Sequence, residues 1–352
     1  MKSQWRAPLG VFASILVLPA AILAGSLIGV SSESRGARLG EGVDLTVYLL
    51  IALVFFEMHW PTVKLHRSDL PFLSLLWVAN FVIVPTIGFL IASVFLSGKP
   101  LFMTGLVIYF MSPCTDWFLG FTRLARGNVA LGAVLIPINM LSQLLLYPVY
   151  LTLFTQWTAN PDLAIVRETI VRWFIIPFLL AGVLRLFVGR VLSPGLAASV
   201  LDVVKRLHTW VLALLVLQIF AGNAITITRH WTVFFLVLAA VFTFFATTLL
   251  IFEWVARQFR LAYADHVLLT MTTAARNAPL MLGVTMAAIP DQPLVYTAIV
   301  LGMLVEFPHL TLLKHLLLRR RARLAEPMSE GSFGDGRHKD HPETLGPHQV
   351  YS

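Results

Sequence analysis

Long apolar runs separated by short polar stretches fill the chain up to about residue 318. Each run has roughly 20 residues or more, which is enough for an α-helix to cross a bilayer. The pattern therefore predicts an all-α polytopic membrane protein with ten transmembrane helices. The ten expected spans cover residues 8–30, 42–60, 70–96, 101–121, 128–154, 163–188, 201–221, 230–254, 265–288 and 294–318.

The two ends of the chain differ in character. The first apolar run follows the basic residues Lys2 and Arg6 and continues to about Val30, which is longer than the apolar stretch of a cleaved signal peptide. We expect it to be the first helix of one transmembrane domain, residues 1–318. Residues 319–352 are polar and rich in Gly, Pro, Asp and His, which predicts a disordered tail.

The spacing of the runs suggests a duplication. Spans two to five begin at residues 42, 70, 101 and 128, and spans seven to ten begin at residues 201, 230, 265 and 294, a nearly constant offset. Because five helices per half is an odd number, the halves 8–155 and 163–318 would have opposite orientations. This predicts the inverted repeats of many secondary transporters. Ten unrelated helices with short loops would also give such spacings.

Composition and charge support the membrane interpretation. The 352 residues are 58% hydrophobic and 12% charged, against roughly 25% charged residues in soluble domains, and the mean hydropathy is +0.81. The net charge of +8 could suit nucleic acid. However, the Lys and Arg residues lie mainly in the short loops on one side, where they determine topology. We therefore expect the lipid bilayer as partner and no nucleic acid, with both termini cytoplasmic and the protein in the inner (plasma) membrane.

The chain offers little catalytic or metal-binding chemistry. Its single cysteine, Cys114, excludes an internal disulfide and a multi-thiolate zinc site. The sequence has no glycine-rich phosphate loop, no HExxH motif and no nucleophile–base motif. We expect no cofactor and no enzymatic activity.

Two expected spans are interrupted near their centres. The fourth contains Pro113 and Asp116, and the ninth contains Arg276 and Pro279. Proline removes a backbone donor, and backbone groups freed at membrane depth need partners in protein or in a wet cavity. Each break also carries a charge, which costs at least about 2.5 kcal/mol near the bilayer centre. Broken helices at matching places in two halves indicate a transporter's binding site. The alternative is two proline kinks with a structural Asp–Arg pair.

A carboxylate lies in the middle of the tenth span. Glu306 is followed closely by Pro308, and a charge at this depth is expensive unless it faces a cavity or a partner. Glu306 is therefore a candidate proton-coupling or substrate-binding group. The alternative is a salt bridge with Arg276.

Other polar residues within the spans give weaker signals. Asn139 and Gln143 lie four residues apart, hence on one face of the fifth span. They either line the same cavity or form hydrogen bonds to a neighbouring helix. Glu57 and Glu253 lie near helix ends, where we expect their carboxylates to reach the aqueous interface.

Taken together, these residues resemble the arsenite efflux permeases of the Acr type, within the bile acid/sodium symporter superfamily. The resemblance extends over residues 8–318. It rests on Pro113-Cys114-Thr115 in the fourth span, Arg126-Gly127-Asn128 before the fifth, Asn139 within it and Val305-Glu306 in the tenth.

The resemblance implies a ten-helix fold with a panel and a core domain, in which the fourth and ninth helices cross at their unwound centres. It also implies that Cys114 and Glu306 form the transport-essential pair, driven by the proton gradient without sodium. Arsenite and antimonite are thiophilic, so that Cys114 would be the metalloid ligand. Glu306 would take up a proton as the solute leaves, giving antiport by alternating access. The candidate substrate-binding residues are Pro113, Cys114, Thr115, Asp116, Asn139, Arg276 and Asn277.

Several residues depart from the family pattern and mark a divergent member. Trp117 follows Asp116 where small or apolar residues are usual, Met140 follows Asn139, and Arg276 precedes Asn277 where paired asparagines are common. Two hypotheses follow for Arg276. Its guanidinium could bind the carboxylate or sulfonate of a small organic anion, as in a bile-acid-transporter-like carrier with or without sodium coupling. It could instead stand where a coupling cation would otherwise sit, which would make transport independent of sodium.

Overall fold

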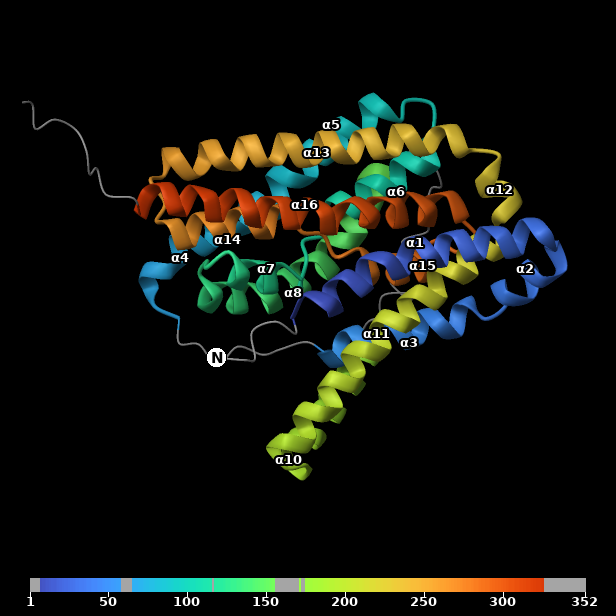
Figure 1. Ribbon diagram of the computed structural model, residues 1–352, viewed down its shortest axis with the longest axis horizontal. Coiled ribbons are helices and arrows are strands. Elements are labelled where there is room, and N and C mark those ends of the chain that lie inside the picture. Colours follow the sequence, from blue (N-terminus) through green and yellow to red (C-terminus); the bar gives the residue numbers. More distant parts are fainter. Residues whose placement is uncertain (1–6, 58–64, 116, 156–170, 172–174, 326–352) are drawn as a thin grey trace, which may run out of the picture.

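The computed structural model describes residues 7–57, 65–115, 117–155, 171 and 175–325. Within these ranges the regular elements are helices, and one isolated β-bridge is the exception. Figure 1 shows the arrangement of the elements. They are α1 (Ala7–Ser31), α2 (Glu33–Gly40), α3 (Val43–Glu57), α4 (Leu70–Val78), α5 (Val84–Phe95), α6 (Pro100–Phe110), α7 (Trp117–Leu124), α8 (Val129–Thr155), α10 (Ile176–Val191), α11 (Pro194–Gly222), α12 (Ala224–Thr228), α13 (Trp231–Gln258), α14 (Tyr263–Ala274), α15 (Ala278–Ala288) and α16 (Pro293–Ala325).

The all-helical, multi-pass character expected from the sequence is confirmed, while the count of ten spans and their inverted repeat stay predictions. Four helical stretches of the described residues are long and apolar enough to cross a membrane, and the pair α2 and α3, bent by 41°, would make a fifth. The four stretches are Arg67–Phe95, Val129–Tyr150, Trp231–Gln258 and Pro293–Arg323. Part of the expected sixth span lies outside the described residues.

Two helix boundaries differ from those expected. Helix α11 begins at Pro194, well before residue 201, because proline is favoured in the first turn of a helix. Helix α16 continues to Ala325, past the end expected at residue 318. Its last turns are rich in Arg, which has a high helix propensity and suits the negative end of a helix. Residues 326–352, the rest of the expected tail, lie outside the described residues. The division of the chain into a membrane domain and a tail stays a prediction.

The third span contains a π-helical turn, Ala79–Ile83, between α4 and α5. Pro85 follows this turn and has no N–H to donate to the carbonyl of Phe81, four residues earlier. The hydroxyl of Tyr150 on α8 donates to that carbonyl instead, at 2.6 Å. Asn80 lies within this turn and is buried. Because π turns often occur at functional sites, Asn80 is a candidate neighbour of the site.

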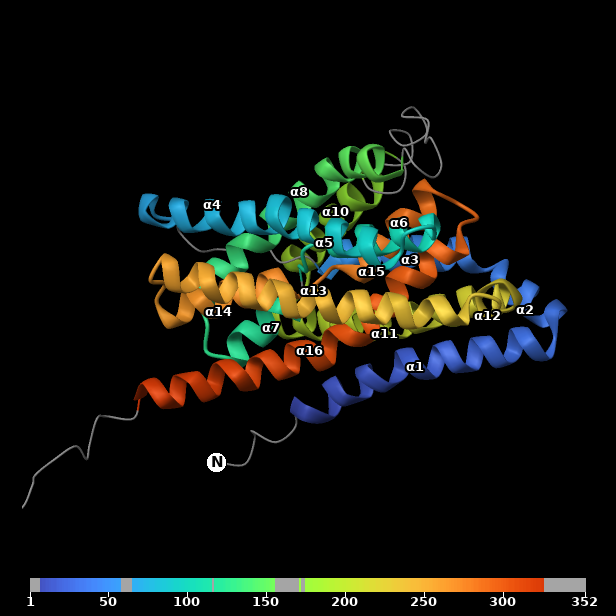
Figure 2. The same cartoon turned by 90° about the horizontal axis from the view of Figure 1, so that it is seen from above.

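The helices form two groups. In the first group, α11 packs on α1, α2 and α3, and α10 packs on α3. In the second, α16 packs on α6 and α13, α13 packs on α5 and α14, and α7 packs on α8 and α14. Figures 1 and 2 show α13, α14 and α16 side by side, whereas α10 and the first half of α11 project obliquely from them. The groups meet where α15 packs on α3 and where α16 packs on α1 and α11.

Candidate functional site

The interruptions expected in the fourth and ninth spans are present. Helix α6 ends at Phe110 and α7 begins at Trp117, while α14 ends at Ala274 and α15 begins at Ala278. Pro279 lies in the first turn of α15, where backbone N–H groups have no acceptor within the helix, so that the missing N–H of proline costs nothing there. The two unwound segments therefore expose backbone groups in the interior of the second helix group.

These two segments pair with each other in an antiparallel bridge between Pro113 and Arg276. The N–H of Cys114 donates to the carbonyl of Ala275 at 3.0 Å, and the N–H of Asn277 donates to the carbonyl of Ser112 at 2.8 Å. Pro113 thus occupies a position of the bridge at which no N–H is needed. The crossing of the two broken helices satisfies backbone groups that neither helix could satisfy alone.

Side chains reinforce the crossing. The amide of Asn277 donates to the hydroxyl of Thr115 at 3.1 Å, and both residues are buried. Cys114 is 1% exposed, so that the chain's single thiol residue lies in the bridge itself. The structure therefore brings together Pro113, Cys114, Thr115 and Asn277. Asp116, the remaining candidate of this segment, lies outside the described residues.

The guanidinium of Arg276 is completely buried and is used within the protein. Its Nη1 donates to the carbonyl of Phe110 at 2.8 Å, and its Nη2 donates to the carbonyls of Thr272 and Thr273 at 2.9 and 2.7 Å. These carbonyls end α6 and α14, where helix dipoles place partial negative charge. The ring of Phe244 on α13 lies 6.0 Å from the guanidinium carbon.

Glu306 also contacts the crossing. One carboxylate oxygen accepts the backbone N–H of Arg276 at 3.0 Å, and the other accepts the hydroxyl of Tyr109 at 3.3 Å. Glu306 is 3% exposed. Among the described residues, no ion pair within 4.0 Å joins Glu306 to the guanidinium of Arg276. The salt bridge considered from the sequence is therefore absent from this conformation, and a backbone contact stands in its place.

Close packing between α6 and α16 brings Tyr109 to Glu306. Gly302 on α16 faces the Tyr109 ring so closely that a Cβ atom there would lie 2.7 Å from two ring carbons. A glycine is therefore required at this position for the present geometry. Tyr109 was not identified from the sequence, although a tyrosine in the middle of an apolar span is a usable signal, because a buried hydroxyl needs a partner.

Asn139 lies one contact away from the crossing. The hydroxyl of Thr272 accepts the amide of Asn80 at 3.0 Å and, more weakly, that of Asn139 at 3.5 Å. All three side chains are buried, as is Gln143, whose amide atoms have no hydrogen-bond partner among the described residues. Of the two alternatives for Asn139 and Gln143, the contact of Asn139 with Thr272 on α14 is a hydrogen bond to a neighbouring helix. A cavity lined by both residues stays a prediction. Asn80 is a polar neighbour that sequence reasoning missed.

A small cavity of about 20 Å³ lies between the two helix groups, next to the crossing. It has room for about one water molecule. Trp117, Pro279 and Phe307 in its wall directly follow the segments that carry the candidate residues. The full lining is Leu18, Trp117, His208, Thr209, Leu212, Pro279, Met303 and Phe307.

The interface role expected for Glu57 is wrong. Glu57 is buried, and its carboxylate lies 3.1 Å from Nδ1 of His208, which is also buried. An unpaired carboxylate in this interior would be costly, and the contact ties α3 to α11. A histidine in an apolar span is a signal that sequence reasoning left unused.

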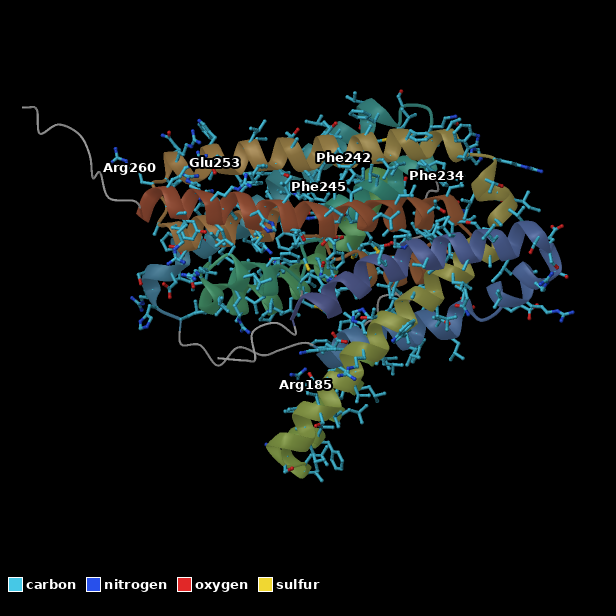
Figure 3. All side chains as sticks on the ribbon, viewed as in Figure 1. Arg185, Phe234, Phe242, Phe245, Glu253 and Arg260 are labelled. Carbon is cyan, nitrogen blue, oxygen red and sulfur yellow. The ribbon has the colours of Figure 1, made fainter. Side chains whose placement is uncertain are left out.

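Glu253 also does more than reach the interface. It is paired with Arg257 at 3.0 Å and with Arg320 of α16, and it lies 2.9 Å from Nε2 of His266 on α14. Figure 3 shows Glu253 near one end of α13, on the side of Arg260 and away from Phe234. The expectation of a solvated carboxylate is corrected: the residue joins the ends of three helices of the second group.

Two comparisons relate the sequence to known proteins. Residues 45–230, more than half of the chain, match the family model described as the Sodium Bile acid symporter family. The Arsenical-resistance protein Acr3 of Corynebacterium glutamicum is 24% identical over 327 residues, an alignment that covers 86% of each chain. Arg276 and Glu306 lie beyond the segment that matches the family model.

Proposed function

Because this chain belongs to the Sodium Bile acid symporter family, we propose that it is a secondary active transporter that exports arsenite or antimonite in exchange for protons. The family assignment agrees with the resemblance found in Pro113-Cys114-Thr115 and Val305-Glu306. Small solutes and protons would be its partners in a bilayer. The metalloid cargo, the coupling to protons and the direction of transport are the parts that we propose.

The observation that carries the proposal is the position of Cys114 in the bridge between the two broken helices. Thiolates prefer soft partners such as trivalent arsenic and antimony. A single sulfur ligand holds such a solute more weakly than three would, which suits a carrier that must release its cargo. The name of the Acr3 relative, an arsenical-resistance protein, supports the same class of cargo.

Glu306 is the proposed proton carrier. Its carboxylate accepts one hydrogen bond from the backbone of Arg276 and one from Tyr109. Hydrogen bonds to an ionised acceptor are stronger than bonds between neutral groups, so that protonation would weaken both contacts. Proton uptake on Glu306 would thereby loosen the backbone next to Cys114 as the solute leaves, and proton release would restore it.

The two helix groups supply the moving parts in this proposal. The cavity between them, about 20 Å³, holds about one water and is too small for a metalloid oxyacid. Binding therefore requires the groups to separate around the crossing, as in rocking of one bundle against another. Trp117, whose ring packs edge-on against Phe307 at 5.0 Å, would move with the second group.

The remaining candidates have supporting roles. As substrate-binding candidates, Pro113, Thr115 and Asn277 would also hold the bridge in shape, and Asn139 would support it through Thr272. Asp116, which precedes Trp117 in the sequence, would be a further polar group for the substrate. We also propose an inner-membrane location with both termini in the cytoplasm, two inverted repeats in residues 8–155 and 163–318, and catalysis of no chemical reaction.

The second candidate is a carrier of a small organic anion, and the family name favours it. In that case Arg276 would bind a carboxylate or sulfonate. The guanidinium already donates to three carbonyls and is fully buried, which disfavours this role in the present conformation. Cys114→Ser separates the two candidates, since it should abolish metalloid transport and spare transport of an organic anion.

The testing experiment is arsenite accumulation in cells that lack their own efflux pump. Cells would express the wild type, Cys114→Ser or Glu306→Gln, with membrane abundance measured for each. We expect the wild type alone to lower intracellular arsenite. If all three proteins match the empty vector at equal abundance, metalloid export is wrong and organic anions become the cargo to test.

A further inference from the structure

Two negative helix ends converge at the crossing. Helix α6 ends at Phe110 and α14 ends at Ala274, and the carbonyls of Phe110, Thr272 and Thr273 point to one place. In transporters with broken helices, unwound carbonyls and the C-terminal ends of half-helices coordinate the coupling cation. The crossing thus has the kind of oxygen ligands that suit a small hard cation.

The side chain of Arg276 occupies this place. It makes three hydrogen bonds of 2.7–2.9 Å to these carbonyls and is completely buried. Arginine stays charged in proteins because its guanidinium is not deprotonated at ordinary pH. The three carbonyls therefore already have a permanent positive partner that belongs to the chain.

A sodium ion, which the family name implies, does not fit these residues. A sodium ion would need the carbonyls to which the guanidinium already donates. The ion and the guanidinium would then lie only a few ångströms apart, and their positive charges would repel strongly in a water-poor interior. The nearby carboxylate of Glu306 is itself engaged by the N–H of Arg276 and the hydroxyl of Tyr109. The carbonyls and the carboxylate of this crossing therefore already accept hydrogen bonds from groups of the protein.

We infer that Arg276 is a built-in cation that replaces a sodium ion at the crossing, and that transport by this protein is therefore independent of sodium. This inference names the coupling of the proposed transport function and rests on that function for its consequence. Sodium enters and leaves with each transport cycle, whereas a side chain cannot. The change of charge that drives the cycle must then come from another group, and Glu306 is the titratable side chain bonded to the backbone of Arg276.

The inference is tested on purified full-length protein in detergent, without any transport substrate. The thermal unfolding midpoint is measured in sodium chloride and in choline chloride of equal ionic strength. We expect the wild type to unfold at the same temperature in both salts. A midpoint that rises in sodium would overturn the inference without any variant, and it would leave the question of metalloid cargo open to the arsenite experiment.

Variants test the role of the charge. Arg276→Lys keeps a positive group at the carbonyls, whereas Arg276→Met fills similar space without charge. We expect the Lys variant to unfold at a higher temperature than the Met variant, and sodium to raise the midpoint of the Met variant by several degrees. If the Lys variant folds and the Met variant does not, that result would also support the need for a positive charge at the carbonyls. A Met variant as stable as the wild type in choline would contradict it.

Arg185→Met is the matched control. Arg185 is half-buried and donates to the carbonyl of Phe56 on α3, away from the crossing. It belongs to α10, and Figure 3 shows it outside the second helix group. We expect no sodium response in this variant. A response equal to that of Arg276→Met would mean that sodium acts on the protein generally, and the inference would be wrong.

Discussion

The carboxylate of Glu306 accepts the backbone N–H of Arg276 at 3.0 Å, while the guanidinium of the same arginine is directed to helix-end carbonyls. One residue thus contacts the acidic group through its backbone and the two helix ends through its side chain. Any change in the charge of Glu306 acts first on the backbone of the crossing. The acidic group and the thiol of Cys114 are consequently linked by the paired segments.

Tyr109→Phe removes the second hydrogen bond of Glu306. A hydrogen bond to a charged group contributes about 1.5–3 kcal/mol, and about 1.4 kcal/mol corresponds to a tenfold change in rate. We expect arsenite export to fall by about tenfold, with the protein still folded. Tyr147→Phe is the control, since that hydroxyl is also buried but donates to Thr285. Equal export by the two variants would contradict the role given to Tyr109.

Gly302→Ala tests the close packing of α16 on Tyr109. The new Cβ would lie 2.7 Å from the ring, and overpacking of this kind typically costs about 1–3 kcal/mol. We expect a lower thermal unfolding midpoint and weaker export. Gly182→Ala on α10 has open space within 4 Å and should keep or raise the midpoint, because alanine favours helix. Unchanged export by Gly302→Ala would show that Tyr109 can move freely.

Thr272→Val removes the hydroxyl that Asn80 and Asn139 share while keeping the shape of the side chain. Two buried amides would each lose a partner, and a buried polar group left without a partner costs about 1–3 kcal/mol. We expect a clear loss of thermal stability. Thr243→Val is the control, because its hydroxyl bonds the carbonyl of Ala239 within its own helix. If the two variants unfold alike, the amide cluster contributes nothing to the fold.

Thr209→Phe tests whether the helix groups must move about the small cavity. The added ring exceeds the roughly 20 Å³ available there, so that it would wedge between α11 and the second group. We expect export to be lost while abundance in the membrane stays near that of the wild type. Leu214→Phe lies on the same helix but is 44% exposed, and it should export normally. Full export by Thr209→Phe would contradict the proposal that the two helix groups separate at this cavity.

Much of the fold could be predicted from the sequence. Apolar runs located the helices to within several residues, and Pro113 and Pro279 located the two breaks, because proline acts on the backbone locally. The end of α16 was misplaced, since a run of arginines resembles a solvated tail by composition and yet has a high helix propensity. The π turn at Ala79–Ile83 has a local cause in Pro85, but its acceptor contact with Tyr150 is visible only in three dimensions.

The site was predicted as a set of residues and not as a set of contacts. Arg276 and Glu306 were candidates because charges are conspicuous in apolar spans. Cys114 became a candidate through its place in the interrupted span and the resemblance of Pro113-Cys114-Thr115 to a known family. Their partners could not be found in this way, since the acceptors of Arg276 are backbone carbonyls and carry no residue signature. The pairing of Glu57 with His208 was missed for a different reason. The histidine is visible in the sequence, but the pairing depends on how α3 meets α11.

The most direct test of the account is arsenite flux in proteoliposomes containing purified protein, with a pH gradient as the driving force and no sodium present. We expect the wild type to accumulate arsenite on the acidic side, and Cys114→Ser and Glu306→Gln to give the flux of empty vesicles. Gly182→Ala, far from the crossing, should behave as the wild type. Gradient-driven flux that persists in Cys114→Ser would contradict the account, because it would remove the thiol from the transport site.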